Sequence, residues 1–201
     1  RTVTIRDAQL LLNGRPLTIT GTNRHEHDPI TGHVVSSASM LRDVQRMKEF
    51  NLNAVRNSHY PNDAQWYHTC DQYGLYVSDE ANIESHGEGI YTPMDLIFNL
   101  ASNPHYRAAH LYRTRSMVAR SRNHPSVLVW SLGNEAGQGT NFLATYAWVK
   151  QTDPTRPVSY EQASYWAWVL HALFGAVWGD VNSDIFTLMY PHPSELDEYV
   201  A

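Results

Sequence analysis

Short apolar segments that alternate with longer amphipathic ones restrict the fold of this chain more than any other feature. Strand-length apolar segments lie at residues 53–57, 75–79 and 126–132, and helix-length segments separate them. Two further strands are predicted near residues 158–161 and 185–189. Apolar strands that alternate with helices belong to parallel sheets covered by helices. The pattern therefore predicts an α/β fold, either an open doubly wound sheet or a (β/α)8 barrel.

Residues suited to helix ends frame the amphipathic segments. Ser39 is a candidate N-cap for the helix predicted over residues 40–50. Gly74 ends a second helix, because glycine adopts the left-handed backbone of a helix end without strain. Asn103 followed by Pro104 is typical of a helix start. These signals place helices between successive strands.

The absence of a dinucleotide-binding motif favours the barrel over the open sheet, and the number of strands indicates that the barrel is incomplete. No Gly-x-Gly-x-x-Gly motif follows the first strand, so no dinucleotide site is indicated. About six strands can be counted, whereas a complete barrel has eight and typically about 250 residues. We therefore expect residues 17–201 to form an incomplete TIM barrel whose C-terminal part is missing from the chain.

The first residues predict a short β-hairpin ahead of the barrel. An apolar segment leads into Asn13 and Gly14, and Asn-Gly supplies the two positive-φ positions of a type I′ turn. The partner strand is expected to run from Pro16 to about Gly21. Residues 1–16 are therefore predicted to form an N-terminal hairpin that leads into the barrel.

Composition and charge exclude several classes of protein. The chain of 201 residues is 42% hydrophobic and 17% charged, and no stretch reaches the roughly 18 apolar residues that span a bilayer. The net charge of -5 argues against a nucleic-acid partner, because nucleic-acid-binding surfaces are basic. A single cysteine, Cys70, excludes an internal disulfide framework.

The start of the chain has no initiator methionine, basic n-region or apolar h-region. We therefore expect an interior piece of a longer protein. We expect a cytoplasmic location for that protein, which the missing start of the chain does not test. Such a piece would need the rest of its polypeptide, or self-association, to cover open sheet edges.

Polar and titratable residues follow several predicted strands, at the end where barrel enzymes carry their active sites. Glu135 follows the strand at 126–132, which is apolar enough to be buried on both faces. A carboxyl group partly desolvated at the mouth of a barrel holds its proton near neutral pH, as a general acid requires. Asn134 beside it could donate to a substrate hydroxyl. A helix-capping glutamate is the alternative for the same position.

Hydrogen-bond donors follow other strands of the predicted barrel. His25, Arg56 and His59 would bond the hydroxyl groups of a sugar if they converge at one rim. For each histidine taken singly, a structural role is the alternative. Their convergence is therefore what the structure must test.

Glu84 and His86 indicate a metal site. They are two residues apart, so in an extended segment their side chains share a face. With Glu135 as a third ligand they suit a divalent ion. Mg²⁺ prefers oxygen ligands and retained waters, and the imidazole also fits Mn²⁺ or Zn²⁺. A plain Glu–His hydrogen bond is the alternative.

His25 and His27 also fit a rival function. Two imidazoles after a first barrel strand are typical of metal-dependent amidohydrolases, in which zinc activates water. That function also requires a lysine or further histidines at later strand ends, and both lysines, Lys48 and Lys150, fall in predicted helices. A non-catalytic carbohydrate-binding fragment would explain the donors and aromatic residues, but not Glu135 at the end of a buried strand.

Five sequence blocks resemble the catalytic TIM barrel of glycoside hydrolase family 2, and they occur in the family's order. They read NGRPL from Asn13, NRHEH from Asn23, NAVRNSHYP from Asn53, DEANIESHG from Asp79 and NHPSVLVWSLGNE from Asn123. The final SLGNE is a specific signature, and the resemblance covers nearly the whole chain. It implies a β-galactosidase of the bacterial lacZ type, with β-glucuronidase and β-mannosidase as alternatives.

The resemblance also implies roles for individual residues in a retaining hydrolysis of terminal β-D-galactosides such as lactose. The family's acid/base corresponds to Glu135, and its magnesium ligands correspond to Glu84, His86 and Glu135. The positions that contact the sugar or transition state correspond to His25, Arg56, His59, Asn134 and Tyr190. The family further implies a homo-oligomer, a tetramer, and a Na⁺ ion in the parent protein.

The nucleophile departs from the family pattern. In the family it follows a later strand in a Cys-Glu-Tyr-type block, and no such block occurs in this chain. Glu80 and Glu161 are conceivable substitutes, but nothing in their sequence context supports that role. Residues 164–184 are longer and more aromatic than the family leads one to expect. We therefore expect this chain by itself to have little or no activity.

Overall fold

A five-stranded parallel sheet forms the centre of the molecule. The computed structural model describes residues 1–86, 99–163, 182–187 and 190. The strands follow one another in space as in sequence, in the order β4-β5-β6-β7-β8. Their bounds are β4 Gly21–Arg24, β5 Ala54–Asn57, β6 Tyr76–Glu80, β7 Val127–Ser131 and β8 Val158–Ser159. Every neighbouring pair in this sheet is parallel.

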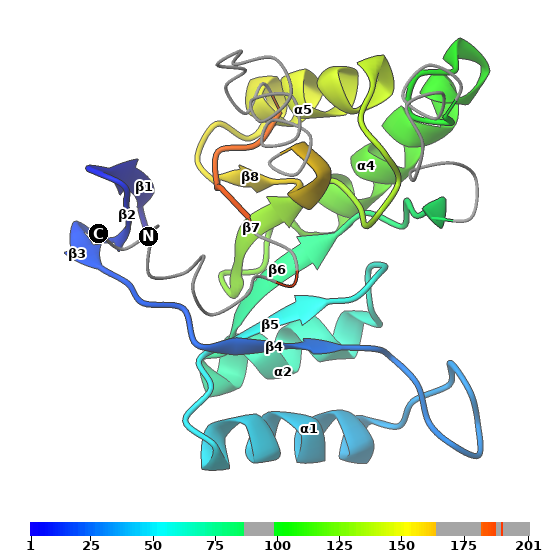
Figure 1. Cartoon of the computed structure of the whole chain (residues 1–201). Helices are drawn as coiled ribbons and strands as arrows, with labels where there is room; N and C mark the ends of the chain where they lie inside the picture. The colour runs from blue at the N-terminus through cyan, green and yellow to red at the C-terminus, as the bar shows by residue number, and fades with distance from the viewer. Residues whose placement is uncertain (87–98, 164–181, 188–189, 191–201) are drawn as a thin grey trace.

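Helices connect the strands along one side of the curved sheet (Figure 1). The connecting elements are α1 Ser37–Glu49, α2 Ala64–Tyr73, the 3₁₀ turn η2 Pro104–Tyr106, α4 Arg107–Ser121 and α5 Thr140–Thr152. Because successive right-handed crossovers run in one direction across the sheet, each helix falls on the same face. The predicted α/β barrel architecture is thereby confirmed as a partial barrel, and the open doubly wound sheet is excluded. None of the helices among the described residues is long and apolar enough to cross a bilayer.

The first helix begins earlier than predicted. Its N-cap is Ser36, whose backbone is extended and whose Oγ accepts the Ser39 N–H at 3.2 Å. The prediction of Ser39 as the cap was wrong, because the serine three residues earlier satisfies one of the unpaired N–H groups of the first turn. The predicted end of α2 is confirmed, since Gly74 has φ +65° and closes that helix.

The N-terminal residues form a three-stranded antiparallel sheet of β1 Val3–Arg6, β2 Gln9–Leu12 and β3 Arg15–Pro16. The predicted turn at Asn13–Gly14 is present, and both residues have positive φ. A second turn, at Asp7–Ala8, was not predicted. The partner strand ends at Pro16 rather than near Gly21, because Gly21 already pairs with Ala54 in the parallel sheet.

The strands predicted near the C-terminus differ from those observed. The strand predicted at 158–161 covers only Val158 and Ser159. The strand predicted at 185–189 is not present at 185–187, and 188–189 lie outside the described residues, as does most of the aromatic segment 164–184. Asp184 meets β8 through one backbone and one side-chain bond instead of a strand: its N–H donates to the Val158 carbonyl at 2.7 Å, and its Oδ2 accepts the Val158 N–H at 2.8 Å.

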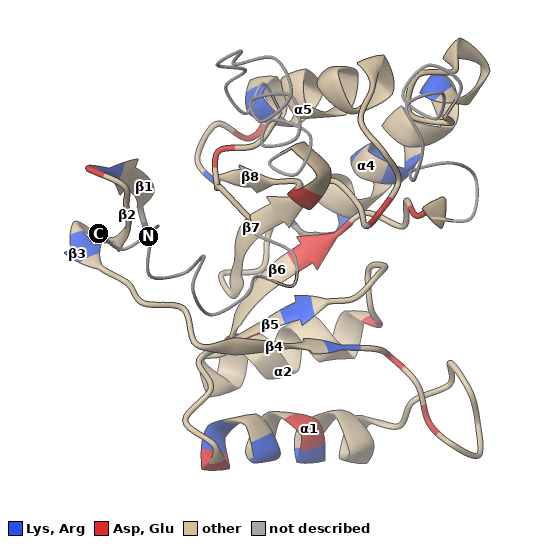
Figure 2. Cartoon of the chain, in the orientation of Figure 1, with Lys and Arg blue, Asp and Glu red and all other residues tan. Residues whose placement is uncertain are grey.

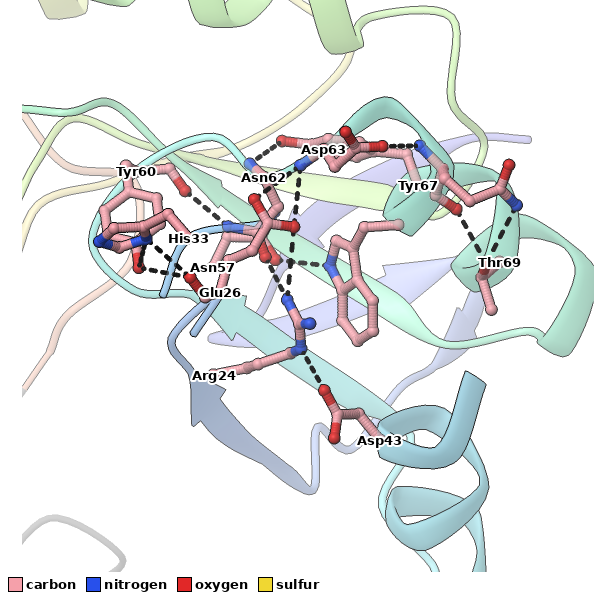
Figure 3. A network of polar contacts seen from close by, with 12 residues as sticks. Arg24, Glu26, His33, Asp43, Asn57, Tyr60, Asn62, Asp63, Tyr67 and Thr69 are labelled. Carbon is pink, nitrogen blue, oxygen red and sulfur yellow. Dashed lines mark hydrogen bonds and ion pairs between the residues drawn. The ribbon is translucent and has the colours of Figure 1, made fainter. Parts of the chain in front are cut away.

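The helix-facing side of the sheet holds the core together with a buried polar network. Met40, Val44, Val55, Val77, Met117 and Phe142 are among its buried apolar side chains. Beside them, the Arg24 guanidinium donates to Asp43 and Asn62, at 2.8 and 2.7 Å (Figure 3). It also lies over the Trp66 ring. Because these bonds join β4, α1 and the residues before α2, they hold the first helices against the sheet.

Candidate active site

A polar pocket of about 370 Å³ lies at the carboxyl ends of the sheet strands. Most of the predicted site residues line it, namely Arg56, His59, Glu84, Asn134, Glu135 and Tyr190. Figure 2 shows the acidic end of β6 beside the basic end of β5, so opposite charges meet at this edge. The predicted convergence at one rim is therefore present for these residues.

Glu80, fully buried at the end of β6, anchors several polar side chains of the pocket. Its Oε2 accepts bonds from Arg56 Nε and Ser131 Oγ, both at 2.6 Å. Its Oε1 lies 2.6 Å from His59 Nδ1. All three partners belong to neighbouring strands or their ends. Because one carboxylate binds all three, they are held in fixed orientations before any ligand arrives.

Arg56, held by Glu80, in turn orients the side chain of Asn134. Its Nη2 donates to Asn134 Oδ1 at 2.9 Å. The amide oxygen of Asn134 is therefore engaged, and its amide nitrogen is the group left to donate to a ligand. The predicted pairing of Asn134 with a substrate hydroxyl is consistent with this orientation.

Glu135, four residues beyond the end of β7, has an unusual backbone conformation. Its φ is +39°, a region that side-chain-bearing residues rarely adopt. Gly133, two residues earlier, has φ +153°, and a Cβ there would lie 2.6 Å from the Ile83 carbonyl oxygen. Only glycine permits this close approach. The turn therefore packs directly on the segment that carries Glu84, and an isolated bridge pairs Glu84 with Asn134.

Glu161 holds this turn from the other side. Its Oε1 accepts the Glu135 N–H at 2.6 Å. Glu161 is buried, and burial raises the pKa of its carboxyl group to about 7, with the charge of Glu80 acting in the same direction. A backbone N–H bond to the carboxylate favours its charged form and partly opposes the effect of burial.

Glu84, His86 and Glu135 form the predicted metal-ligand group. One ligand atom from each lies within 4.8 Å of the other two. His86 Nδ1 and Glu135 Oε2 are in direct contact. Two carboxylates and one imidazole match the donor set expected for Mg²⁺ with an accompanying nitrogen ligand. The residues present therefore fit a divalent ion.

Tyr190 and His25 lie at the border of the pocket. Tyr190 is exposed, and its hydroxyl donates to Glu135 Oε1 at 3.3 Å. The His25 ring packs edge-on against His59 at 5.2 Å. Partial burial and the neighbouring His59 lower the pKa of His25. His25 is therefore a neighbour of the pocket residues rather than part of the pocket wall.

The structure does not bring together the ligands of the rival amidohydrolase site. His25 contacts His59 and Tyr60, whereas the ring of His27 packs against His33 at 5.5 Å. Within the described part of the chain, neither His25 nor His27 belongs to a group of three metal-ligating side chains. A zinc-bound water held by these two histidines has no support.

Glu80, Ser131 and Glu161 have larger roles in the pocket than the sequence suggested. Glu80 was considered only as a substitute nucleophile, yet it is the common partner of Arg56, His59 and Ser131. The signal that could have found it is its place at the carboxyl end of a buried strand, next to the strand that carries Arg56.

Comparison with known proteins decides the family. The family model of glycosyl hydrolases family 2, TIM barrel domain, matches residues 3–201. The chain belongs to glycosyl hydrolase family 2. The family 2 barrel explains why the polar residues gather at the carboxyl ends of the strands, where barrel enzymes carry their sites.

Curated relatives of this family 2 chain include bacterial β-galactosidases. The chain is 54% identical over 161 residues to the β-galactosidase of Photobacterium profundum, which covers 80% of the chain and 15% of that protein. It is 55% identical, with the same coverage, to the β-galactosidase of Vibrio cholerae. The chain therefore spans about 15% of the length of these relatives.

Solved structures of family 2 enzymes have the same fold. The β-glucuronidase of Ruminococcus gnavus superimposes with a TM-score of 0.71 and 32% identity, over 82% of this chain and 29% of that one. The β-D-glucuronidase of Dictyoglomus thermophilum gives a TM-score of 0.65 and 27% identity, over 81% of this chain and 29% of that one.

Proposed function

We propose that the protein to which this chain belongs is a retaining β-galactosidase with Glu135 as its acid/base. The observation that carries the proposal is the 54% identity to a bacterial β-galactosidase over 80% of the chain. Sequence similarity supplies the substrate class, and the position of Glu135 supplies the chemistry.

Glu135 has the surroundings of a proton donor. Its side chain is 12% exposed and lines the pocket, so it can reach a bound sugar while largely shielded from bulk water. In the first step Glu135 protonates the oxygen of the departing group. In the second step the same carboxylate removes a proton from the incoming water.

A second carboxylate must attack the sugar in a retaining enzyme. Glu80 is an unsuitable nucleophile, because Arg56, His59 and Ser131 already occupy its two oxygens. Glu161 is also unsuitable, because it accepts the Glu135 N–H and burial raises its pKa to about 7. We expect the nucleophile to come from outside the described residues.

The remaining pocket residues bind and orient the sugar. Asn134 offers its amide nitrogen, His59 and Arg56 offer the N–H groups that Glu80 does not take, and Tyr190 keeps a hydroxyl beside Glu135. His25 extends this set through its contact with His59. Several fixed donors suit a ligand rich in hydroxyl groups.

A Mg²⁺ ion, or Mn²⁺ in its place, would be held by Glu84, His86 and Glu135. When bound, the ion would neutralise charge near Glu135 and fix the orientation of its carboxylate. Glu84 and Glu135 are already brought together by the packing of the Gly133 turn on the Ile83 segment. The chain thus brings these ligands close to one another through its own backbone.

A neutral sugar suits the pocket better than a uronic acid. Arg56 is the one arginine or lysine in the pocket wall formed by the described residues, and its guanidinium is ion-paired with Glu80 at 2.6 Å. A glucuronate would require a free cation to pair with its carboxylate. β-Glucuronidase and β-mannosidase are the alternative activities that the experiment below distinguishes from β-galactosidase.

We also propose that the chain consists of a small N-terminal unit and part of a catalytic barrel. Residues 1–16 form a small N-terminal unit, and residues 17–201 contribute part of a catalytic barrel. A second cavity of about 470 Å³ lies on the inner face of the sheet, and Ile19, Ala54, Tyr76 and Val129 contribute apolar side chains to its lining. Further barrel strands of the same polypeptide would cover this apolar surface. The homo-oligomer, the Na⁺ ion and the cytoplasmic location stay predictions of the family resemblance.

Replacement of Glu135 in the full-length protein tests the proposal. Glu135→Gln is expected to lower kcat for a nitrophenyl β-galactoside by about 10²- to 10⁴-fold, because general acid–base catalysis contributes that much. Azide should partly restore turnover of substrates with activated leaving groups, since these need no acid and azide needs no base. Glu49→Gln, an exposed change on α1, serves as the matched control.

Three outcomes would overturn the assignment. Unchanged turnover in Glu135→Gln would remove Glu135 from the mechanism. Faster hydrolysis of the matching β-glucuronide or β-mannoside would replace the sugar. Substantial turnover by the 201-residue chain alone, assayed with and without Mg²⁺, would place the nucleophile within it.

A further inference from the structure

A second group of metal-ligating side chains lies away from the active site. His68, Asp71 and His124 each offer one ligand atom, and these atoms all lie within 4.8 Å of one another. His68 and Asp71 belong to α2, and His124 precedes β7. The group therefore lies near the amino-terminal start of β7, whereas the pocket lies at the carboxyl ends of the strands. It has no part in the proposed hydrolysis.

Helix geometry brings the first two side chains together. Residues three apart on an α-helix share a face, so His68 and Asp71 project side by side from α2. His124 arrives from the loop after α4, and its ring meets that of His68 edge-on with centroids 5.0 Å apart. The three groups thus join two segments that are distant in sequence.

Asp71 fixes the position of the His124 ring. Its Oδ2 lies 2.7 Å from His124 Nδ1, and its Oδ1 accepts the Ser126 N–H at 2.8 Å. This contact holds the His124 imidazole in one orientation, with a ring nitrogen beside a carboxylate oxygen, so two potential ligand atoms already lie together. The hydrogen bond from the Ser126 N–H in turn holds the Asp71 carboxylate in place.

From this geometry we propose that His68, Asp71 and His124 form a surface site for a divalent transition-metal ion of the Zn²⁺ type. Two imidazoles and one carboxylate are the donors that Zn²⁺ prefers, at about 2.0–2.2 Å from the ion. Binding would displace the proton shared between His124 and Asp71. Because His68 is exposed, the ion can enter from solvent and keep water as its fourth ligand.

The surroundings limit the affinity of this site. Arg1 interacts electrostatically with Asp71 and bonds the Val127 carbonyl, so a positive charge already lies close by. Cys70, next to Asp71 in sequence, is fully buried, and burial raises the pKa of its thiol, so it supplies no thiolate. The ion would act structurally, by linking α2 to the α4–β7 loop.

Zinc titration of the purified chain tests the site. After removal of metals with EDTA, isothermal titration with Zn²⁺ is expected to show one binding equivalent that His68→Ala abolishes or weakens at least 10-fold. His105→Ala, which removes another exposed histidine, is the matched control and should leave that equivalent unchanged. His68→Ala is preferred to changes at Asp71, because Asp71 also supports the fold through Ser126.

The titration separates this site from the proposed magnesium site. His86→Ala should remove any zinc bound by the active-site group and leave the His68-dependent equivalent in place. Zinc should also raise the Tm of the parent chain more than that of His68→Ala. Equal stoichiometry, affinity and zinc-induced Tm shift in the parent and in His68→Ala would overturn the inference. If His105→Ala also lost this zinc-binding equivalent, the binding would be nonspecific binding to surface histidines and the inference would be wrong.

Discussion

Asp79 and Glu80 are neighbours on β6, yet they serve opposite sides of the sheet. Asp79 faces the helices, where its Oδ1 accepts the Tyr67 hydroxyl at 2.6 Å and the Asn57 amide at 3.0 Å. Glu80 faces the pocket and binds Arg56, His59 and Ser131. Successive side chains of a strand point to opposite faces. The same chemical group is therefore structural at one position and part of the site at the next.

The partners of the two carboxyl groups show what each face requires. On the helix side the donors are neutral, and burial raises the pKa of Asp79. On the pocket side Glu80 meets a guanidinium and an imidazole. The helix side thus accommodates a carboxyl group through neutral hydrogen bonds, whereas the pocket side uses one to hold the Arg56 guanidinium and the His59 ring in place.

The largest effect is expected from removing the carboxyl group on the helix side. Asp79→Ala should lower the free energy of unfolding by about 4 kcal/mol, because it leaves two buried donors unpaired and a cavity. Urea denaturation of the chain measures this loss. Asp79→Asn keeps an acceptor oxygen for Tyr67 and Asn57, and should cost less than about 1 kcal/mol. Equal losses in both variants would contradict the hydrogen-bond explanation.

A smaller effect, visible as a pH dependence, is expected at Glu161. Its pKa of about 7 lies above the ordinary value of 4.5, so the folded state binds this proton more tightly than the unfolded state does. Stability from this group is therefore greatest below about pH 4.5 and declines as pH rises toward 7. Glutamine cannot ionise. The free energy of unfolding of Glu161→Gln, measured relative to the parent, should therefore rise by on the order of 2 kcal/mol from pH 5 to pH 8.

Urea denaturation at the two pH values, with EDTA present, checks this difference. Exposed Glu49→Gln is the control and should show the same offset from the parent at both pH values. A flat difference for Glu161→Gln would mean that burial does not perturb this carboxyl group.

The smallest stability effect is expected on the pocket side. Glu80→Gln should cost only about 1 kcal/mol in urea denaturation, because the partly exposed Arg56 and His59 can turn to water in the cavity. In the full-length protein the same change should lower kcat at least 10-fold, since Asn134 loses its fixed orientation. If Glu80→Gln destabilised the chain as much as Asp79→Ala, the contrast between the two faces would disappear.

Much of this arrangement could be predicted from sequence, where a signal is local. The Gly74 helix end and the turn at Asn13–Gly14 follow from backbone preferences of single residues. The metal-ligand spacing of Glu84 and His86 is likewise local, and the structure places the predicted third ligand, Glu135, beside the pair. The start of α1 was wrong by three residues, because Ser36 and Ser39 both suit an N-cap and only the actual chain path selects one.

Roles that depend on neighbours across strands could not be predicted in the same way. Nothing in the residues around Glu161 indicates that its carboxylate accepts the Glu135 N–H, 26 positions earlier. The zinc-type group is similar, because His124 is 53 residues from Asp71. Such contacts depend on strand register and helix packing rather than on local preference.

By itself the sequence determined the alternation of strands and helices, the family, and the position of Glu135 after a buried strand. These follow from hydrophobic periodicity, helix-end signals and the SLGNE block, each of which is contained in a short stretch of the chain. The tertiary structure alone decided which carboxyl group of the Asp79–Glu80 pair enters the pocket, and that Glu161 holds the Glu135 turn. The physical reason is that a side chain's role depends on the face it occupies and on its partners there, and parallel pairing of distant strands selects both.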